Sequence, residues 1–250
     1  MRRRAFLGVV AILVALFATT GTALALFARH VPAFYERSAL PPGEPRRCHC
    51  RDFLSRSSEL FNMMGGTRSW DQEFTQDQFN GYFQSQDEDG ELSARIVEIP
   101  DEIKDVRVAF EEDLIRVGFR YGEGRWSCVV SVEFRVWLVA HQANVIALEL
   151  CDFRAGALPL GTRSLIDFLT EAARRENIDV TWFRHGGHPI ALLKLQANQS
   201  RPTFQLRRLE VHPGRFVIAS RPTAEPTAPP AAALPPSPPP PDLPAALPAR

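Results

Sequence analysis

The sequence predicts an α+β domain in which a long, curved antiparallel sheet carries two or three helices packed on one face. An N-terminal transmembrane helix precedes this domain, and a disordered Pro-rich tail follows it. Three observations predict this arrangement: an uncharged apolar run near the N-terminus, a proline- and alanine-rich C-terminus, and long stretches between them with a period of two residues. About 170 residues remain for the domain, enough to bury a core without disulfide or metal staples.

The first segment, Ala5–Phe27, contains no charged residue and directly follows Arg2, Arg3 and Arg4. A helix of this length covers about 34 Å, which is enough to cross the hydrocarbon core of a bilayer. The arginines predict a cytoplasmic N-terminus and an exported remainder, as in a single-pass protein of a bacterial inner membrane. Small residues at 22, 23 and 25 leave cleavage of the segment as an alternative.

The remaining boundaries follow from proline content. We expect residues 1–30 to form the cytoplasmic tip and anchor, residues 31–50 a juxtamembrane linker, residues 51–220 the extracytoplasmic domain, and residues 221–250 a disordered tail. The chain has 29 basic and 29 acidic residues and a net charge of zero, so we expect no nucleic-acid partner.

Two helices are predicted at the start of the domain. The first, over residues 52–64, has an inner face of Phe53, Leu60, Phe61 and Met64. The second begins at Thr75, which forms a capping box with Gln78, while Phe74 and Phe79 occupy the positions of a hydrophobic staple. Its core-facing residues are Phe79, Tyr82 and Phe83. These structural roles explain the polar and aromatic residues here, so neither Asp77 nor Asn80 is assigned to catalysis.

From Ile96 onward the period changes to two. Strands over residues 106–110, 115–121, 126–138 and 145–153 predict an antiparallel meander with one buried face and one wet face. A helix follows within residues 158–177, with Leu165, Phe168, Leu169 and Ala172 inside and Asn177 as its stop. Four further strands are predicted over residues 178–183, 190–195, 203–211 and 216–219.

No group of residues predicts a reaction. The "CHC" of residues 48–50 lacks the spacing of zinc ligands, and the acidic stretch 87–91 fails the EF-hand pattern. "HGGH", residues 185–188, is read as a glycine turn, with an anion loop as its alternative. Period two places Cys128 and Cys151 on opposite faces unless a bulge intervenes, so free thiols are expected. We expect no enzyme, no catalytic residue, no metal and no cofactor.

Two short motifs carry a resemblance. Thr75, Gln76, Asp77 and Asn80 fit a "T-E-E-x-x-N-x-x-L"-like helix start with Phe83 at the leucine position. Residues 158–160 fit a "G-x-L-P-L-P"-like segment, although Gly161 replaces its final proline. Together with the single anchor and the alternating strands, they resemble bacterial envelope proteins of the YpmS and LmeA type, over roughly residues 74–220. The resemblance implies an extracytoplasmic fold with a hydrophobic concave surface for lipid, and it carries over no catalytic residue.

These observations favour a membrane-anchored domain that binds a lipid-like or apolar ligand in envelope maintenance. The candidate ligand-binding residues lie on the apolar face of the longest strand: Trp126, Val130, Val132, Phe134 and Val136. Two alternatives remain open. The face is only the core beneath the helices, or the chain is a non-catalytic scaffold that reaches an envelope protein partner through its Pro-rich tail.

Overall fold

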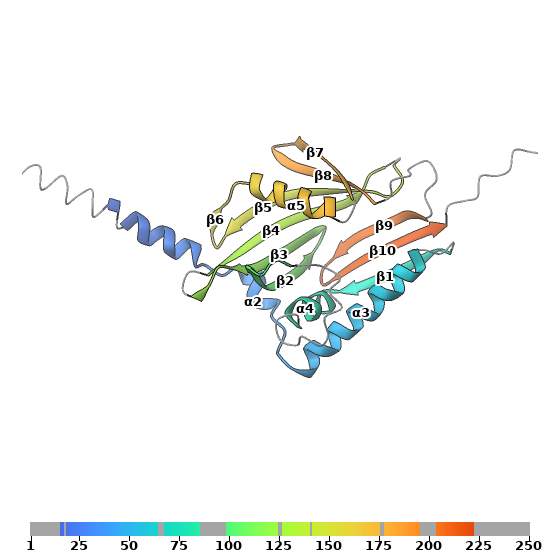
Figure 1. The fold of residues 1–250 in the computed structure, drawn as a ribbon, viewed down its shortest axis with the longest axis horizontal. Coiled ribbons are helices and arrows are strands. Elements are labelled where there is room, and N and C mark those ends of the chain that lie inside the picture. Colours follow the sequence, from blue (N-terminus) through green and yellow to red (C-terminus); the bar gives the residue numbers. More distant parts are fainter. Residues whose placement is uncertain are drawn as a thin grey trace, which may run out of the picture.

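The computed structural model describes residues 16–17, 19–64, 68–85, 99–124, 127–140, 142–175, 178–195 and 204–222. The chain folds into an α+β structure with a large antiparallel sheet, a smaller one and a few helices (Figure 1). The predicted fold class is thereby confirmed at this level. The predicted Pro-rich tail lies outside the described residues from position 223 onward.

The seven-stranded sheet has the order β2-β3-β4-β5-β8-β7, with β6 paired to β5. Its strands are β2 (Ile103–Glu111), β3 (Leu114–Tyr121), β4 (Cys128–Leu138), β5 (Val145–Ala155), β6 (Leu158–Pro159), β7 (Asp179–His185) and β8 (His188–Lys194). The three-stranded sheet has the order β1-β10-β9, built from β1 (Trp70–Thr75), β9 (Phe204–His212) and β10 (Arg215–Pro222). The helices are α2 (Ala33–Arg37), α3 (Glu44–Met64), α4 (Gln76–Ser85) and α5 (Arg163–Arg175).

The predicted strands are all present, but they form two sheets instead of one. The strands β9 and β10 pair with each other and not with the large sheet, and they are joined by β1, which was not predicted as a strand. Its residues alternate between buried and exposed, and it pairs with β10 from Trp70 opposite Ser220 to Thr75 opposite Arg215. This partner lies at the other end of the domain, so no local pattern points to it.

The start of α4 follows the predicted capping chemistry. The Gln78 backbone N–H donates to Thr75 Oγ1 at 3.3 Å, and the Thr75 N–H donates to Gln78 Oε1 at 2.9 Å. The rings of Phe74 and Phe79 lie 5.9 Å apart, as the hydrophobic staple requires. The capping box therefore fixes the direction in which the chain leaves β1 and enters α4.

The predicted linker over residues 31–50 is instead structured. It contains α2 and the first turns of α3, and Phe34 and Tyr35 are buried in a cluster with Ala109 and Val129 of the large sheet. Gly118 of β3 permits this contact, because a Cβ there would lie 2.6 Å from Tyr35 Cδ2. Proline content predicted a spacer, whereas the two aromatic residues between the prolines decide the packing.

Tyr35 is held by polar contacts as well. Its hydroxyl donates to the Asp105 carbonyl at 2.7 Å, and Arg107 Nη1 donates to the Tyr35 carbonyl at 2.7 Å. The Arg107 guanidinium also lies 4.2 Å from the centre of the Tyr35 ring. Burial, reinforced by the charge of Asp105, raises the pKa of the Tyr35 phenol. The segment that follows the N-terminal helix is thus fastened to β2 and β3.

Two helical faces differ from the predicted ones. Phe61 of α3 is 60% exposed and Phe168 of α5 is 46% exposed, although both were predicted to face the core. In α3 the packed face runs through Phe53 and Leu60, which contact α4 and the small sheet. In α5 no residue is buried, so the helix rests on the domain without being enclosed by it.

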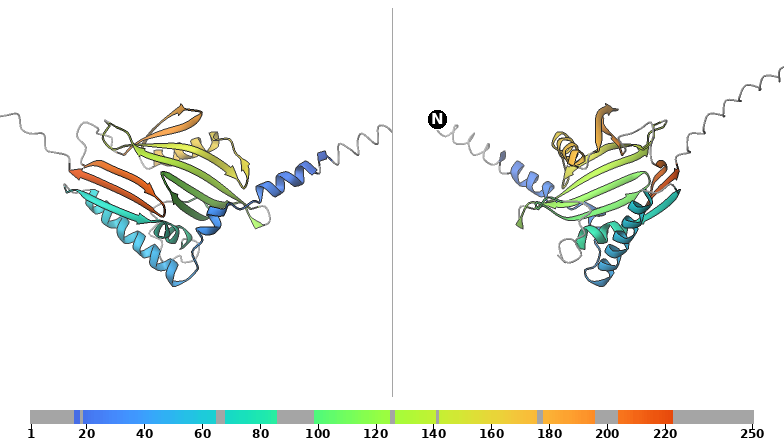
Figure 2. Two further views of the ribbon diagram at one scale, coloured as in Figure 1. Left: turned by 180° about the vertical axis from the view of Figure 1, so that it is seen from behind. Right: turned by 45° about the vertical axis from the view of Figure 1, so that its right-hand side comes forward.

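The N-terminal region is described from residue 16, so most of the predicted anchor lies outside the described residues. Residues 19–28 are helical. No helix within the described part of the chain is long and apolar enough to cross a membrane. Figures 1 and 2 show this helix projecting from the domain at the end opposite to β9 and β10.

Two buried asparagines bind strand edges. Asn80 of α4 is fully buried; its side-chain amide donates to the Val108 carbonyl at 2.8 Å and accepts from the Val108 N–H at 2.7 Å. Asn144, which precedes β5, donates in the same way to the Phe204 carbonyl at 2.6 Å and accepts from the Leu206 N–H at 2.7 Å. The two strands, β2 and β9, are at the edges of their sheets, and each amide side chain binds backbone groups there that have no neighbouring strand.

We predict that Asn80→Ala lowers the free energy of unfolding by about 2–4 kcal/mol, because it leaves the buried N–H and C=O of Val108 without partners. Urea denaturation of the full chain in detergent, followed by circular dichroism, measures this change. Asn62→Ala, at an exposed position of α3, is the matched control and should change stability by no more than about 0.5 kcal/mol. Equal stability of the two variants would contradict the role of Asn80.

Candidate ligand-binding face

One face of the seven-stranded sheet is apolar from edge to edge. Residues directly opposite each other in neighbouring strands share a face, so the strand registers define rows across it. We call this surface the apolar sheet face. Its rows are Leu158–Ala155–Val130–Phe119, Phe153–Val132–Val117–Val108, Leu150–Phe134–Ile115–Phe110, Trp182–Ala191–Leu148–Val136 and Val180–Leu193–Ile146–Leu138.

The opposite face is largely polar. On it Arg116 pairs with Glu111 and Glu133 at 3.0 Å each, and Arg135 lies 3.9 Å from Glu149. The predicted division into one apolar and one wet face is therefore present. Apolar residues interrupt this polar side where Val129 and Ala109 meet α2, and again at Ile190 and Phe183.

A β-bulge in β5 preserves the alternation along β4. Glu133 pairs with Asp152 and Phe134 with Leu150, so Cys151 is the extra residue. Ala155 and Phe153, on one side of the bulge, lie on the apolar sheet face. Because of the extra residue, Leu150, Leu148 and Ile146 on the other side of the bulge lie on the same face. The possibility that a bulge would place Cys151 irregularly, which the sequence left open, is realised.

Part of the apolar sheet face is the contact between the two sheets. Val108 and Phe110 form a core cluster with Val211 of β9, with Val136 packed against it. Leu138 and Ile146 pack against Trp70, Phe204 and Leu206 in a second cluster. This half of the face has a structural function.

Another part of the face lies beside α5. The Trp182 indole Nε1 donates to Thr170 Oγ1 at 2.8 Å, and Trp182 belongs to the apolar sheet face, so α5 lies on that side of the sheet. Figure 1 shows α5 running across β5, next to the β7–β8 hairpin. The inner residues of α5, Leu165, Ile166 and Leu169, are only half-buried. An amphipathic helix on an apolar sheet ordinarily buries its apolar stripe, and α5 does so only in part.

The predicted wall residues fall into different surroundings. Val130 and Val132 are buried, and Phe134 is half-buried. Val136 belongs to the contact between the sheets. Trp126 lies outside the described residues. Phe119, Phe134, Leu148 and Phe153 are among the half-buried side chains of the face, and only Phe134 of these four was a predicted wall residue.

Apart from the apolar sheet face, a hollow lies beside the end of the helix over residues 19–28. It has a volume of about 430 Å³ and is lined by Ala23, Leu26, Phe27, His30 and Ala157. Its walls are almost entirely apolar. The sequence signal that could have found it is the i, i+3, i+4 spacing of Ala23, Leu26 and Phe27, which was hidden within a uniformly apolar run.

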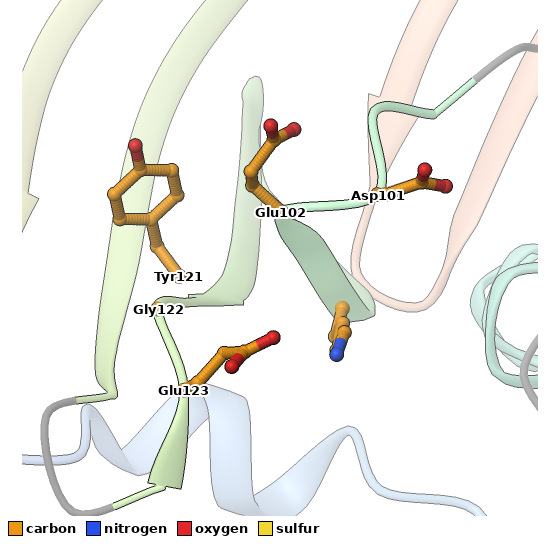
Figure 3. A pocket seen from close by; sticks show the side chains of 6 residues that line it. Asp101, Glu102, Tyr121, Gly122 and Glu123 are labelled. Carbon is orange, nitrogen blue, oxygen red and sulfur yellow. The ribbon is translucent and has the colours of Figure 1, made fainter.

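Another hollow, with a volume of about 370 Å³, is acidic. Asp101, Glu102, Lys104, Tyr121, Gly122 and Glu123 line it, at the end of β3 and the start of β2. Figure 3 shows that the carboxylates of Asp101 and Glu102 point in different directions instead of toward one point. Among the described residues, no group of three or more His, Cys, Asp or Glu is placed to hold a metal ion.

The histidine motif behaves as the predicted turn. His185 ends β7 and His188 begins β8, and Gly186 and Gly187 between them have φ values of 60° and 91°. Positive φ at two central residues is typical of a tight hairpin turn, which explains both glycines. His188 Nδ1 lies 3.3 Å from the Leu150 carbonyl.

No protein-family model, curated protein or solved structure matches this chain. The resemblance to envelope proteins of the YpmS and LmeA type therefore stays a prediction.

We predict that the two thiols of "CHC" react at very different rates. Cys48, Cys50, Cys128 and Cys151 are all free, but Cys48 is exposed and Cys50 is buried against α4. Burial raises the pKa of the Cys50 thiol, so less reactive thiolate is present at a given pH. Maleimide labelling at mildly alkaline pH, followed by peptide mass spectrometry, should modify Cys48 first and Cys50 only after denaturation. Equal labelling of the folded chain would contradict the packing of α3 on α4.

Proposed function

We propose that this chain is a single-pass inner-membrane protein whose extracytoplasmic domain binds a lipid-like, apolar ligand in envelope maintenance. The ligand lies on the part of the apolar sheet face beside α5, against Val130, Val132 and Phe134. Val136 supports this wall from the adjoining core. We propose no catalytic step and no bound cofactor for this function.

The observation that carries the proposal is the incomplete burial of two apolar surfaces that face the same side of the sheet. Phe119, Phe134, Leu148 and Phe153 are half-buried on the sheet, and α5 has no buried residue. Covering such surfaces contributes roughly 25 cal/mol for each Å² removed from water. A ligand with a long apolar part gains this free energy, whereas a polar solute does not.

The proposed location supports the same ligand class. The apolar run Ala5–Phe27 leads directly into the domain, so a membrane anchor formed by this run would hold the sheet close to a reservoir of lipid. The resemblance to the YpmS and LmeA type points to lipid as well. Core packing alone remains the competing explanation for the face, and a binding measurement separates the two.

We predict that Phe134→Gln reduces the amount of lipid that purifies with the chain, because a polar amide on the apolar sheet face disfavours contact with an acyl chain. Native mass spectrometry of the full chain, released from detergent, measures the bound mass. Phe183→Gln is the matched control: Phe183 is exposed, and its register with Ile190 and Glu149 places it on the opposite face of the same sheet.

The expected result is retained lipid in the wild type and in Phe183→Gln, with loss in Phe134→Gln. No bound lipid in any of the three proteins, even after incubation with phospholipid, would contradict the proposal. It would favour the scaffold hypothesis, in which deletion of residues 222–250 abolishes function.

A further inference from the structure

The hollow at the end of the N-terminal helix is built from two distant parts of the chain. Ala23, Leu26 and Phe27 occupy one face of the helix, at the i, i+3 and i+4 positions, and His30 follows two residues after the helix ends. Ala157 closes the hollow from the turn between β5 and β6. Its volume of about 430 Å³ lies within the range of small-molecule sites.

Backbone hydrogen bonds hold the turn against the helix end. The Ala157 N–H donates to the Phe27 carbonyl at 2.9 Å, and the Gly156 N–H donates to the Val129 carbonyl of β4 at 2.7 Å. The Phe27 carbonyl also accepts from the His30 N–H at 3.2 Å, so this carbonyl at the helix end has one local partner and one from the domain. The large sheet is thereby joined to the helix through two consecutive residues.

Only glycine fits at position 156. Its φ is 58°, and a Cβ there would lie 2.3 Å from the Phe27 carbonyl oxygen and 2.5 Å from that of Ala28. These contacts are with backbone atoms, which cannot move aside without displacing the helix. The close approach of turn and helix therefore depends on this residue.

The turn has a defined depth if the apolar run crosses the bilayer. Phe27 is the last residue of that run, and Arg29 and His30 follow it. Because the Ala157 N–H is hydrogen-bonded to the Phe27 carbonyl, the turn would lie at the same depth in the bilayer as the end of the proposed anchor. Leu26 and Phe27 are 66% and 56% exposed, and Leu160 beyond the turn is also exposed. Both segments therefore present apolar side chains that an apolar medium would cover.

We infer that this hollow takes an acyl chain of a membrane phospholipid and forms the membrane-side entrance to the apolar sheet face. Acyl chains surround the proposed anchor, so they are the apolar partner present at this level. Leu158, the residue after Ala157, begins the row Leu158–Ala155–Val130–Phe119, so the hollow lies next to one end of that row. The inference rests on the proposed anchor and, for the continuation onto the sheet, on the proposed function.

The test is photo-crosslinking of the full chain in phosphatidylcholine nanodiscs that contain a phosphatidylcholine with a diazirine on its acyl chain. Peptide mass spectrometry then locates the crosslinks. For the wild type we expect labelling of Leu26 and of the Ala157 turn above that of Ala25, which lies on the other side of the helix and contacts only the surrounding bilayer lipid.

Ala157→Phe should fill the hollow and reduce the labelling of Leu26 to the level of Ala25. Ala157 is half-buried, so the larger side chain has room in the hollow itself. Ala140→Phe is the matched control, because Ala140 is exposed and lies near the opposite end of β5. Circular dichroism establishes that both variants fold.

Gly156→Ala provides a second variant should Ala157→Phe fail to fold. It displaces the turn from the helix end, and Leu26 should again be labelled only as much as Ala25. Equal labelling of Leu26 and Ala25 in the wild type, unchanged in both variants, would overturn the inference and indicate bilayer lipid only.

The positions of the crosslinks also distinguish failure of this inference from failure of the proposed function. Labelling at Leu26 and Ala157 without labelling of β4 and β5 peptides would uphold the entrance and contradict ligand binding on the sheet. Labelling of Phe134 or Phe153 without any excess at Leu26 would uphold the sheet site and reject this entrance.

Discussion

The two-sheet arrangement depends on hydrogen bonds to the backbone groups of edge strands that face protein instead of water. A buried N–H or C=O without a partner costs about 1–3 kcal/mol, and an edge strand presents several of them. Asn80 binds both backbone groups of Val108 in β2, and Asn144 binds the Phe204 carbonyl and the Leu206 N–H in β9. These amides fix α4 against the large sheet and the start of β5 against the small one. The apolar sheet face lies between the two contacts.

Sequence reasoning predicted what local chemistry decides. The capping box of Thr75 and Gln78 and the glycine turn of residues 186–187 depend on residues within a few positions of each other, and they are present as predicted. Contacts between distant segments were not predictable in this way. The pairing of β1 with β10 and the burial of Phe34 and Tyr35 both require partners far along the chain. Asn80 illustrates the limit, because its target in β2 cannot be read from the helix that carries it.

The candidate site shows the same division. A period of two residues correctly predicted which side chains of β4 share a face, but not what covers each of them. Phe134 and Val136 stand two residues apart on one face, yet Val136 packs into a core cluster with Val211 while Phe134 is half-buried. Their surroundings are decided by β9, α4 and α5, whose positions depend on the whole topology. The hollow beside Phe27 was hidden for a related reason, since it needs a turn from beyond β5 to close it.

The attachment of the turn to the helix end has an energetic consequence for the proposed ligand. An acyl chain in a bilayer is already in an apolar medium, so its transfer to an apolar protein surface contributes little hydrophobic free energy of its own. The favourable term is the removal of the protein's half-exposed apolar side chains from water, near Phe134 and Phe153 on the sheet and along α5. A domain free in solution would first have to find the membrane, whereas one that continues the chain of the proposed anchor, with Ala157 hydrogen-bonded to Phe27, would stay beside the lipid at a high effective concentration. Under the proposed function, a weakly favourable exchange would then be sufficient to load the sheet, and the ligand would not have to cross water.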